Sequence, residues 1–280
     1  MRLIALLPAA LALAAAPPRR IVSTAPSVTE LLFDLGAGSR VAGVTSYCRW
    51  PEAARSLPKV GAFLEPNYER ILTLRPDLVV TIRNPVRLTE RLREMGLNAL
   101  EVDTERLAGV YAAAETIGRA LGLEAEGRAL AGRIRAGLAG LRPPAGAPRP
   151  SVLLLVGRSP GALDNLIAAG RDTYLHEVLE TVGGRNAVED APVPYPKISI
   201  ETVLKRNPDA ILDMSETGHA EGKARENSAA VRALWSKYPR LKAFARGRIF
   251  VLEGDHFVVP GPRVVEAARA IRGLIFEGTP

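Results

Sequence analysis

The sequence predicts an α/β fold of two Rossmann-like lobes, each with a parallel central sheet, joined by a long rigid α-helix. Two observations indicate the lobes: short β-type runs alternate with helical segments, and one helix–strand unit occurs twice. A third indicates the connection, because a long central stretch lacks β-rich runs. The repeated positions are Glu69, Ile71, Leu72, Pro76, Asp77, Val79 and Val80 in the first copy, and Glu201, Val203, Leu204, Pro208, Asp209, Ile211 and Leu212 in the second.

The first sixteen residues have the pattern of a secretory signal peptide. Arg2 precedes the apolar run Leu3–Ala16, and alanines at alternate positions near its end offer A-x-A cleavage sites. The run is shorter than the ~20 residues that a membrane-spanning helix needs. We therefore expect residues 1–16 to be removed on export and the mature chain to be periplasmic.

The N-terminal lobe is expected over residues 17–104, where strands and helices alternate. Gly36 and Gly96 are typical of helix ends, and Ser27 can cap the helix that follows it. In chain order we expect a strand at 20–25, helix 28–35, strand 41–46, a short helix at 51–57, a short strand at 59–63, the first repeat copy with its strand at 78–82, helix 87–95 and strand 99–102.

The connection is expected over residues 105–142 and the C-terminal lobe over 143–280. Residues 105–141 show apolar side chains at helical spacing, which predicts one or two long helices with a break at Gly122. Prolines at 143, 144, 148 and 150 then end helical structure. The second lobe begins with a strand at 151–156 and closes with a helix at 263–276, and the stiff connection permits only small hinge motions.

A matched carboxylate occupies each copy of the repeat. Asn67 and Ser199 can each cap a helix, which places Glu69 and Glu201 in the first turns that follow. Either Glu alone is explained by its favourable interaction with the helix dipole, about 0.3–1 kcal/mol. The duplication, however, puts one carboxylate at the equivalent position of each lobe, an arrangement suited to a partner made of two parts.

Composition excludes several classes of protein. Cys48 is the sole cysteine of the 280 residues, so the chain can form no internal disulfide and no multi-cysteine metal site. The net charge is +7, but its cationic residues are dispersed among acidic ones. The absence of a basic run or of an aromatic-interleaved basic segment gives nucleic-acid binding little support.

Several segments of the chain together match one known family. They are residues 20–23, 25–27, 29–30, 43–48, 57–61, both repeat copies, 183–186, 193–196 and 254–257. With these segments the chain resembles the helical-backbone (class III) substrate-binding proteins of ABC importers, and within that family the cobalamin-binding members, over essentially the whole mature chain. The resemblance implies a non-enzymatic receptor without a catalytic cofactor, whose ligand is a corrinoid such as cobalamin or cobinamide, and whose partner is an inner-membrane permease dimer with its ATPase.

The resemblance also implies a ligand site between the lobes, formed by Pro26, Tyr47, Phe63, Tyr195 and Asp255. Aromatic side chains suit the apolar faces of a corrin ring, and polar groups suit its amide rim. Phe63, Tyr195 and Ile82 stand where the family carries indole rings, which leaves haem or a ferric siderophore open as alternative cargo.

The resemblance also suggests roles for residues outside the main ligand set, while some of the proposed site residues could instead be ordinary core residues. Glu69 and Glu201 match the pair that docks on arginines of the permease. His256, beside Asp255, is our candidate for axial contact with a metal centre, and Asp164 and Asn165 are further candidates at the cleft edge. Tyr47, Phe63 and Tyr195 could instead be core aromatics, and Cys48 a buried filler rather than a ligand to cobalt or iron.

Two other classes of protein, a serine hydrolase and a metal-ion receptor, match parts of the sequence less well. Residues 157–161 spell G-x-S-x-G, and Ser159, Asp213 and His256 follow the order of an α/β serine hydrolase. Pro160 follows Ser159, however, and a proline has no N–H to donate to an oxyanion. A metal-ion receptor would need clustered ligands, and His176, His219 and His256 show no such spacing.

Overall fold

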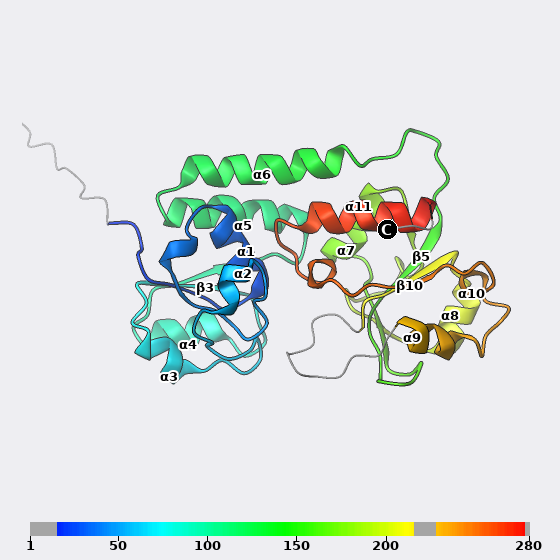
Figure 1. Ribbon diagram of the computed structural model, residues 1–280, viewed down its shortest axis with the longest axis horizontal. Helices are drawn as coiled ribbons and strands as arrows, with labels where there is room; N and C mark the ends of the chain where they lie inside the picture. The colour runs from blue at the N-terminus through cyan, green and yellow to red at the C-terminus, as the bar shows by residue number, and fades with distance from the viewer. Residues whose placement is uncertain (1–15, 216–227, 278–280) are drawn as a thin grey trace, which may run out of the picture.

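The computed structural model describes residues 16–215 and 228–277 and shows two α/β lobes bridged by helices (Figure 1). Residues 1–15, most of the expected signal peptide, lie outside the described residues, as does His219. Among the described residues no helix has both the length and the apolar character needed to cross a membrane.

The N-terminal lobe has a four-stranded parallel sheet in the order β2-β1-β3-β4. Alternate residues of a strand face opposite sides of a sheet, so Ile21 joins the core beneath α1 and α5 while Val22 joins the core beneath α3 and α4. The elements are β1 (Ile21–Ser23), α1 (Pro26–Asp34), the 3₁₀ helix η1 (Gly38–Arg40), β2 (Val41–Gly43), α2 (Glu52–Arg55), α3 (Tyr68–Thr73), β3 (Leu78–Ile82), α4 (Leu88–Glu94) and β4 (Ala99–Val102).

The C-terminal lobe has a six-stranded sheet in the order β10-β9-β5-β6-β8, with β7 also paired to β5. Strands β5, β7, β9 and β10 are parallel, whereas β6 is antiparallel to both of its neighbours. The elements are β5 (Ser151–Gly157), β6 (Leu166–Ala168), α7 (Tyr174–Thr181), β7 (Arg185–Asn186), β8 (Lys197–Ile198), α8 (Ile200–Arg206), β9 (Ala210–Asp213), α9 (Ser228–Trp235), α10 (Lys242–Ala245), β10 (Ile249–Val251), the 3₁₀ helix η2 (Asp255–Phe257) and α11 (Val264–Phe276).

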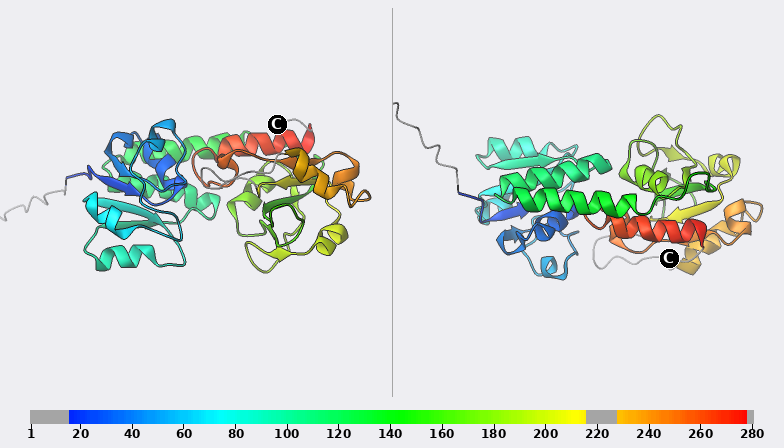
Figure 2. Two further views of the ribbon diagram at one scale, coloured as in Figure 1. Left: turned by 60° about the horizontal axis from the view of Figure 1, so that its bottom comes forward. Right: turned by 90° about the horizontal axis from the view of Figure 1, so that it is seen from above.

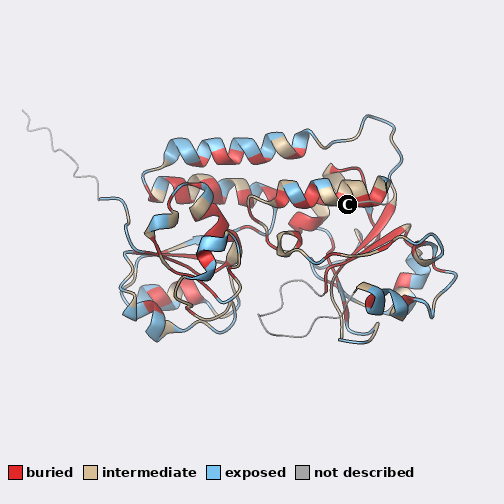
Figure 3. Ribbon diagram, viewed as in Figure 1, coloured by how far each residue is buried: buried red, intermediate tan, exposed pale blue. Residues whose placement is uncertain are grey.

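The connection consists of two packed helices, α5 (Leu107–Ala120) and α6 (Glu124–Ala139), separated by the predicted break at Gly122, whose φ is +68°. The inner faces of both helices are buried while the outer face of α6 is exposed (Figure 3). Seen from above, α6 lies beside α11 of the C-terminal lobe, which it contacts (Figure 2). One continuous apolar core therefore holds Ile21, Val110, Ile134 and Val264, and it joins both lobes to the connection.

Three local details differ from the expectations. Ser27 does not cap α1, because the helix begins two residues earlier than expected, at Pro26, with Ala25 at the cap. In this first turn the missing N–H of a proline costs nothing. Residues 59–63 form isolated bridges rather than a strand. Antiparallel β6 interrupts the expected parallel pattern of the second sheet, since it enters by a turn and not by a helical crossover.

Candidate functional site

A cavity of about 530 Å³ lies between the two lobes and brings together four of the expected ligand residues: Pro26, Tyr47, Phe63 and Asp255. Its size is in the ordinary range for small-molecule sites. The rest of its wall is Thr24, Thr45, Arg49, Ala62, Leu64, Glu65, Val258 and Val259.

The N-terminal lobe provides its wall from loops that follow parallel strands. Pro26 opens α1 directly after β1, and Tyr47 lies in the loop after β2. Ligands of open α/β sheets bind at this carboxyl edge. Phe63 comes from a tight turn in which Gly61 has φ +96°, and a Cβ at Gly61 would lie 2.4 Å from the carbonyl oxygen of Glu65. Only glycine fits there, so Gly61 fixes the loop that presents Phe63.

The C-terminal lobe provides Asp255, Val258 and Val259 from the segment that follows β10. Asp255 forms an ion pair with Arg263 at 3.0 Å, and the same guanidinium donates a hydrogen bond to the carboxylate of Glu30 in α1. Glu30 and Arg263 are largely buried, and through Asp255 this network connects the two lobes next to the cavity. Burial raises the pKa of Glu30 from 4.5 to about 7, although Arg263 opposes the shift.

Two expected ligand residues do not line this cavity. The Tyr195 hydroxyl donates a hydrogen bond of 2.6 Å to Oε1 of Glu105, at the start of the connection. The His256 ring packs against Phe257 with 4.2 Å between ring centroids. Burial, and then the neighbouring Arg263 charge, lower the pKa of His256, which favours the neutral ring. The ligand roles of Tyr195 and His256 stay predictions.

Cys48 is buried beside the cavity as a thiol. Its Sγ lies 3.1 Å from the hydroxyl oxygens of both Thr29 and Thr45, and burial raises its pKa. A protonated, enclosed thiol is a poor metal ligand, so Cys48 fits the filler interpretation. Ile82 does not line the cavity either. Within residues 16–215 and 228–277 no group of three or more His, Cys, Asp or Glu side chains is arranged to hold a metal ion.

The hydrolase arrangement is not formed. Oδ2 of Asp213 accepts from Nε of fully buried Arg158 at 3.2 Å, and Oδ1 accepts from the backbone N–H of Ser215 at 3.0 Å. The Ser159 hydroxyl accepts instead from the side-chain amide of Asn165 at 2.7 Å. Asp213 is therefore committed to Arg158 and does not orient a histidine, as a serine-hydrolase triad requires.

Glu69 and Glu201 are both exposed and lie in the first turns of α3 and α8, as expected. The side chains of Asn67 and Ser199 cap the two helices, with hydrogen bonds of 2.8 and 3.3 Å to backbone N–H groups. Through Ile71 and Val203 the helices pack on the sheet faces remote from α5 and α6, where Figure 1 also draws them. The two carboxylates thus occupy corresponding positions, one on each lobe.

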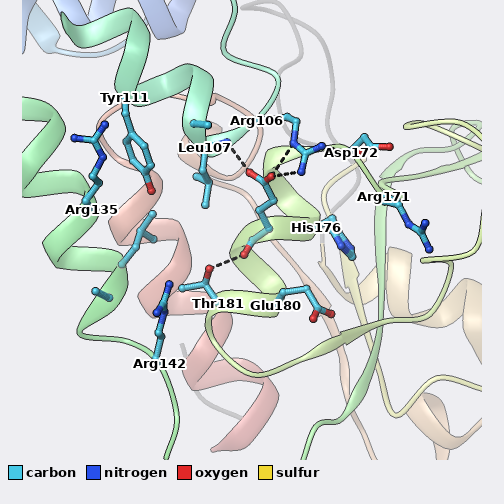
Figure 4. Close-up of a pocket in the computed structure, with 14 residues that line it drawn as sticks. Arg106, Leu107, Tyr111, Arg135, Arg142, Arg171, Asp172, His176, Glu180 and Thr181 are labelled. Atoms are coloured by element: carbon cyan, nitrogen blue, oxygen red, sulfur yellow. Dashed lines mark hydrogen bonds and ion pairs between the residues drawn. The ribbon is translucent and has the colours of Figure 1, made fainter.

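A second concavity, of about 820 Å³, lies between α5, α6 and α7 and contains none of the expected ligand residues. Figure 4 shows the interactions of Arg106 at one side of this concavity. Arg106 contacts Asp172 at 2.5 Å and Glu177 at 2.6 Å, and Glu177 also accepts the Leu107 backbone N–H at 2.7 Å. This concavity has the larger volume, but we interpret it as a contact surface between the connection and the C-terminal lobe and not as a ligand site. The charge of Arg106 is already paired with Asp172 and Glu177.

Sequence reasoning missed three side chains of the interlobe region: Arg49, Glu30 and Arg263. Arg49 stands two positions after Tyr47, but a lone arginine in a loop carries no distinguishing pattern. Glu30 and Arg263 meet only through the tertiary fold. The family resemblance therefore predicted Pro26, Tyr47, Phe63 and Asp255 of the cavity wall, whereas it did not indicate Arg49, Glu30 or Arg263.

Known proteins resemble the chain over nearly its whole length. A vitamin B12-binding protein of Photorhabdus laumondii is 30% identical over 91% of this chain and 87% of the relative. An uncharacterized ABC transporter substrate-binding lipoprotein of Bacillus subtilis is 28% identical, over 94% of this chain and 81% of the relative.

Two solved structures have the same fold as this chain, and the names of the two proteins specify different ligands. A periplasmic vitamin B12-binding protein of Vibrio cholerae superposes with a TM-score of 0.77 at 26% identity, covering 92% of this chain and 97% of that one. A periplasmic heme-binding protein of Roseiflexus superposes with a TM-score of 0.78 at 27% identity, covering 92% and 98%. Residues 21–255 match the family described as periplasmic binding protein. The chain therefore belongs to the periplasmic binding protein family and is a substrate-binding protein, not an enzyme.

Proposed function

We propose that this periplasmic binding protein of an ABC importer captures a corrinoid in the cavity between its lobes and delivers it to the permease. The observation that carries the proposal is the composition of that cavity, in which Tyr47 and Phe63 stand with apolar side chains while Thr24, Thr45 and Asp255 add polar groups. A corrin ring has apolar faces and a rim of amide arms. The cavity offers partners for both.

Burial of the ring faces would supply most of the affinity. Apolar area removed from water contributes about 25 cal/mol per Å², from which the costs of association and ordering are subtracted. The shared core of lobes and connection favours a cavity that is largely formed before the ligand arrives. Such preorganisation raises affinity, because little ordering remains to be done on binding.

Delivery would use Glu69 and Glu201. Both are exposed, and one lies on each lobe at equivalent turns. An inner-membrane permease dimer offers two equivalent subunits, and paired arginines on them would match the two carboxylates. Ion pairs of this kind guide orientation and association rate more than they add affinity.

Haem is the second candidate, and one observation favours it. The phenol ring of Tyr47 lines the cavity, and a tyrosine oxygen can serve as an axial ligand to haem iron. The similarity to the heme-binding protein of Roseiflexus supports this alternative as strongly as the B12-binding relatives support a corrinoid. A ferric siderophore is the third candidate cargo for a binding protein of this fold.

Retention of a coloured ligand tests the proposal. The purified mature protein is mixed separately with cobalamin, cobinamide, haem and a ferric siderophore and passed through gel filtration. A corrinoid receptor carries corrinoid absorbance with its protein peak in about 1:1 ratio. Retention of haem or siderophore alone would reassign the cargo, and retention of none of the four would refute the proposal.

A further inference from the structure

One cation in the wall of the interlobe cavity has no partner. Within the described part of the chain, the side chain of Arg49 makes no ion pair and no hydrogen bond, and its Nε and Nη2 atoms are buried. A guanidinium stays charged at any ordinary pH and presents its N–H donors in a fixed fork. Such a group is rarely left buried and unpaired.

The described carboxylates near Arg49 do not form an ion pair with it. Asp255 is engaged by Arg263 at 3.0 Å, and that guanidinium is shared with Glu30. Glu65 also lines the cavity, but it is exposed and does not come within ion-pair distance of Arg49. Among the described residues that line the interlobe cavity, no anion pairs with this guanidinium.

The side chain of Arg49 is also not needed to shape its loop. The backbone carbonyl of Arg49 accepts a hydrogen bond of 3.1 Å from Nε of Arg55, and the adjacent Cys48 is held by Thr29 and Thr45. Backbone and neighbours thus fix the loop without the guanidinium. Its place in the cavity wall leaves the cargo as the group that it can pair with.

We propose that Arg49 is the anion-binding residue of the cavity and that the cargo carries a phosphate or carboxylate group. This inference rests on the proposed function and narrows its substrate class to anionic tetrapyrroles. A phosphodiester, as in the nucleotide arm of cobalamin, and a carboxylate, as on haem, both accept charge-assisted N–H bonds from an arginine. Cobinamide lacks that phosphodiester, and the dimethyl ester of haem lacks free carboxylates.

Matched ligand pairs test Arg49 directly. Dissociation constants are measured by absorbance titration for cobalamin against cobinamide, and for haem against its dimethyl ester. A charge-assisted hydrogen-bond pair corresponds to about 10- to 100-fold in affinity. We expect the wild type to bind the anionic ligand of a pair, cobalamin or haem, more tightly than its counterpart by that factor. Arg49→Gln should lose this preference, because only its affinity for the anionic ligand decreases.

The controls separate charge from folding. Arg91→Gln makes the same change at an exposed position of α4 and should leave both constants unchanged. Arg49→Lys keeps the charge without the fork and should retain part of the preference. Thermal unfolding shows whether Arg49→Gln is folded. If it is not, the ligand preference of Arg49→Lys is compared with that of the wild type instead.

The outcomes distinguish this inference from the proposed function. A preference for cobalamin identifies a phosphodiester as the anion, and a preference for haem identifies a carboxylate. Tight binding without preference, or an Arg49→Gln variant that keeps the wild-type preference, overturns the role of Arg49 and leaves the receptor function standing. Binding of no tetrapyrrole overturns both.

Discussion

Arg263, beside the N-terminus of α11, donates a hydrogen bond to the carboxylate of Glu30 in α1, on the opposite lobe. The same guanidinium contacts Asp255 at 3.0 Å and lies 5.0 Å from the ring centre of Trp50. One cation thus contacts two carboxylates where the lobes meet. Burial raises the pKa of Glu30, and the nearby charge of Asp255 adds to this shift, so protonation of Glu30 is favoured although Arg263 opposes it.

Stability should depend on pH through Glu30. Its pKa in the folded protein is raised to about 7 from 4.5, so its stabilising contribution is complete below about pH 4.5 and is lost as the pH rises through 7. The upper limit of the loss is about 3 kcal/mol. Urea unfolding of wild type and Glu30→Gln between pH 5 and 8 should show this decline in the wild type only. An equal decline in both proteins would contradict the assignment, and Glu124→Gln provides an exposed control.

Transport should fail without loss of binding when the paired carboxylates are reversed. Glu69→Arg combined with Glu201→Arg puts like charges against the arginines expected on the permease, which costs several kcal/mol at an interface. Uptake of the radiolabelled cargo should fall to background while the affinity of the purified protein changes less than about twofold, well under 1 kcal/mol.

A matched control for that double variant is Glu124→Arg with Glu126→Arg. These two carboxylates are also exposed and lie in the first turn of a helix, but that helix is α6 of the connection. Uptake should survive this change. A large loss of ligand affinity in the Glu69/Glu201 variant would refute the separation of docking from binding.

Removal of the aromatic wall should weaken binding. Phe63→Ala deletes a ring that lines the cavity, which should cost about 1–3 kcal/mol, or 10- to 100-fold in dissociation constant. Phe33→Ala, at a position outside the cavity lining, is the comparison for general loss of packing. Equal affinity in wild type and Phe63→Ala would remove Phe63 from the site.

Tyr195 requires a separate pair of variants, because its hydroxyl binds Glu105 outside the cavity lining. Tyr195→Ala should lower ligand affinity if its ring reaches the cargo, whereas Tyr195→Phe removes only the hydrogen bond, a change of about 1 kcal/mol in stability. Isothermal titration and thermal unfolding measure the two effects. Unchanged affinity in Tyr195→Ala would exclude Tyr195 from the ligand site.

The helix pair of the connection should be sensitive to a single methyl group. A Cβ at Gly127 of α6 would lie 2.8 Å from the carbonyl oxygen of Ala114 in α5, and this backbone atom cannot move aside cheaply. Gly127→Ala should destabilise the protein by about 1–3 kcal/mol. Gly132→Ala, in the same helix with open space around it, should stabilise by up to about 1 kcal/mol. Thermal unfolding of both variants measures the contrast, and equal shifts would contradict it.

The sequence predicted what local patterns and the repeat determine. Strands β3 and β4 match their expected ranges within one residue, and the helix break at Gly122 is confirmed by its positive φ. Antiparallel β6 was not foreseen, because a three-residue strand has no periodicity to read. Family resemblance supplied Pro26 and Asp255, which the fold does bring to one cavity.

The charges around the cavity could not be read in the same way. Glu30 and Arg263 meet across the lobe boundary, and no local pattern couples residues so distant in sequence. Arg49 is recognised by its Nε and Nη2 atoms, which are buried without a hydrogen-bond partner, and this property exists only in the folded chain. Surface helix turns such as that of Glu69, by contrast, are set by neighbouring capping residues and are visible in the sequence.

The two lobes contribute very unequally to the cavity wall. The N-terminal lobe provides nine of its residues through the loops after β1 and β2 and before α3, while the C-terminal lobe adds only Asp255, Val258 and Val259. A cargo bound there would contact mainly the N-terminal lobe, and in particular three loops that are neighbours in space. Substitutions confined to these three loops would therefore change which ligand fits, while the core shared by the two lobes stays unchanged.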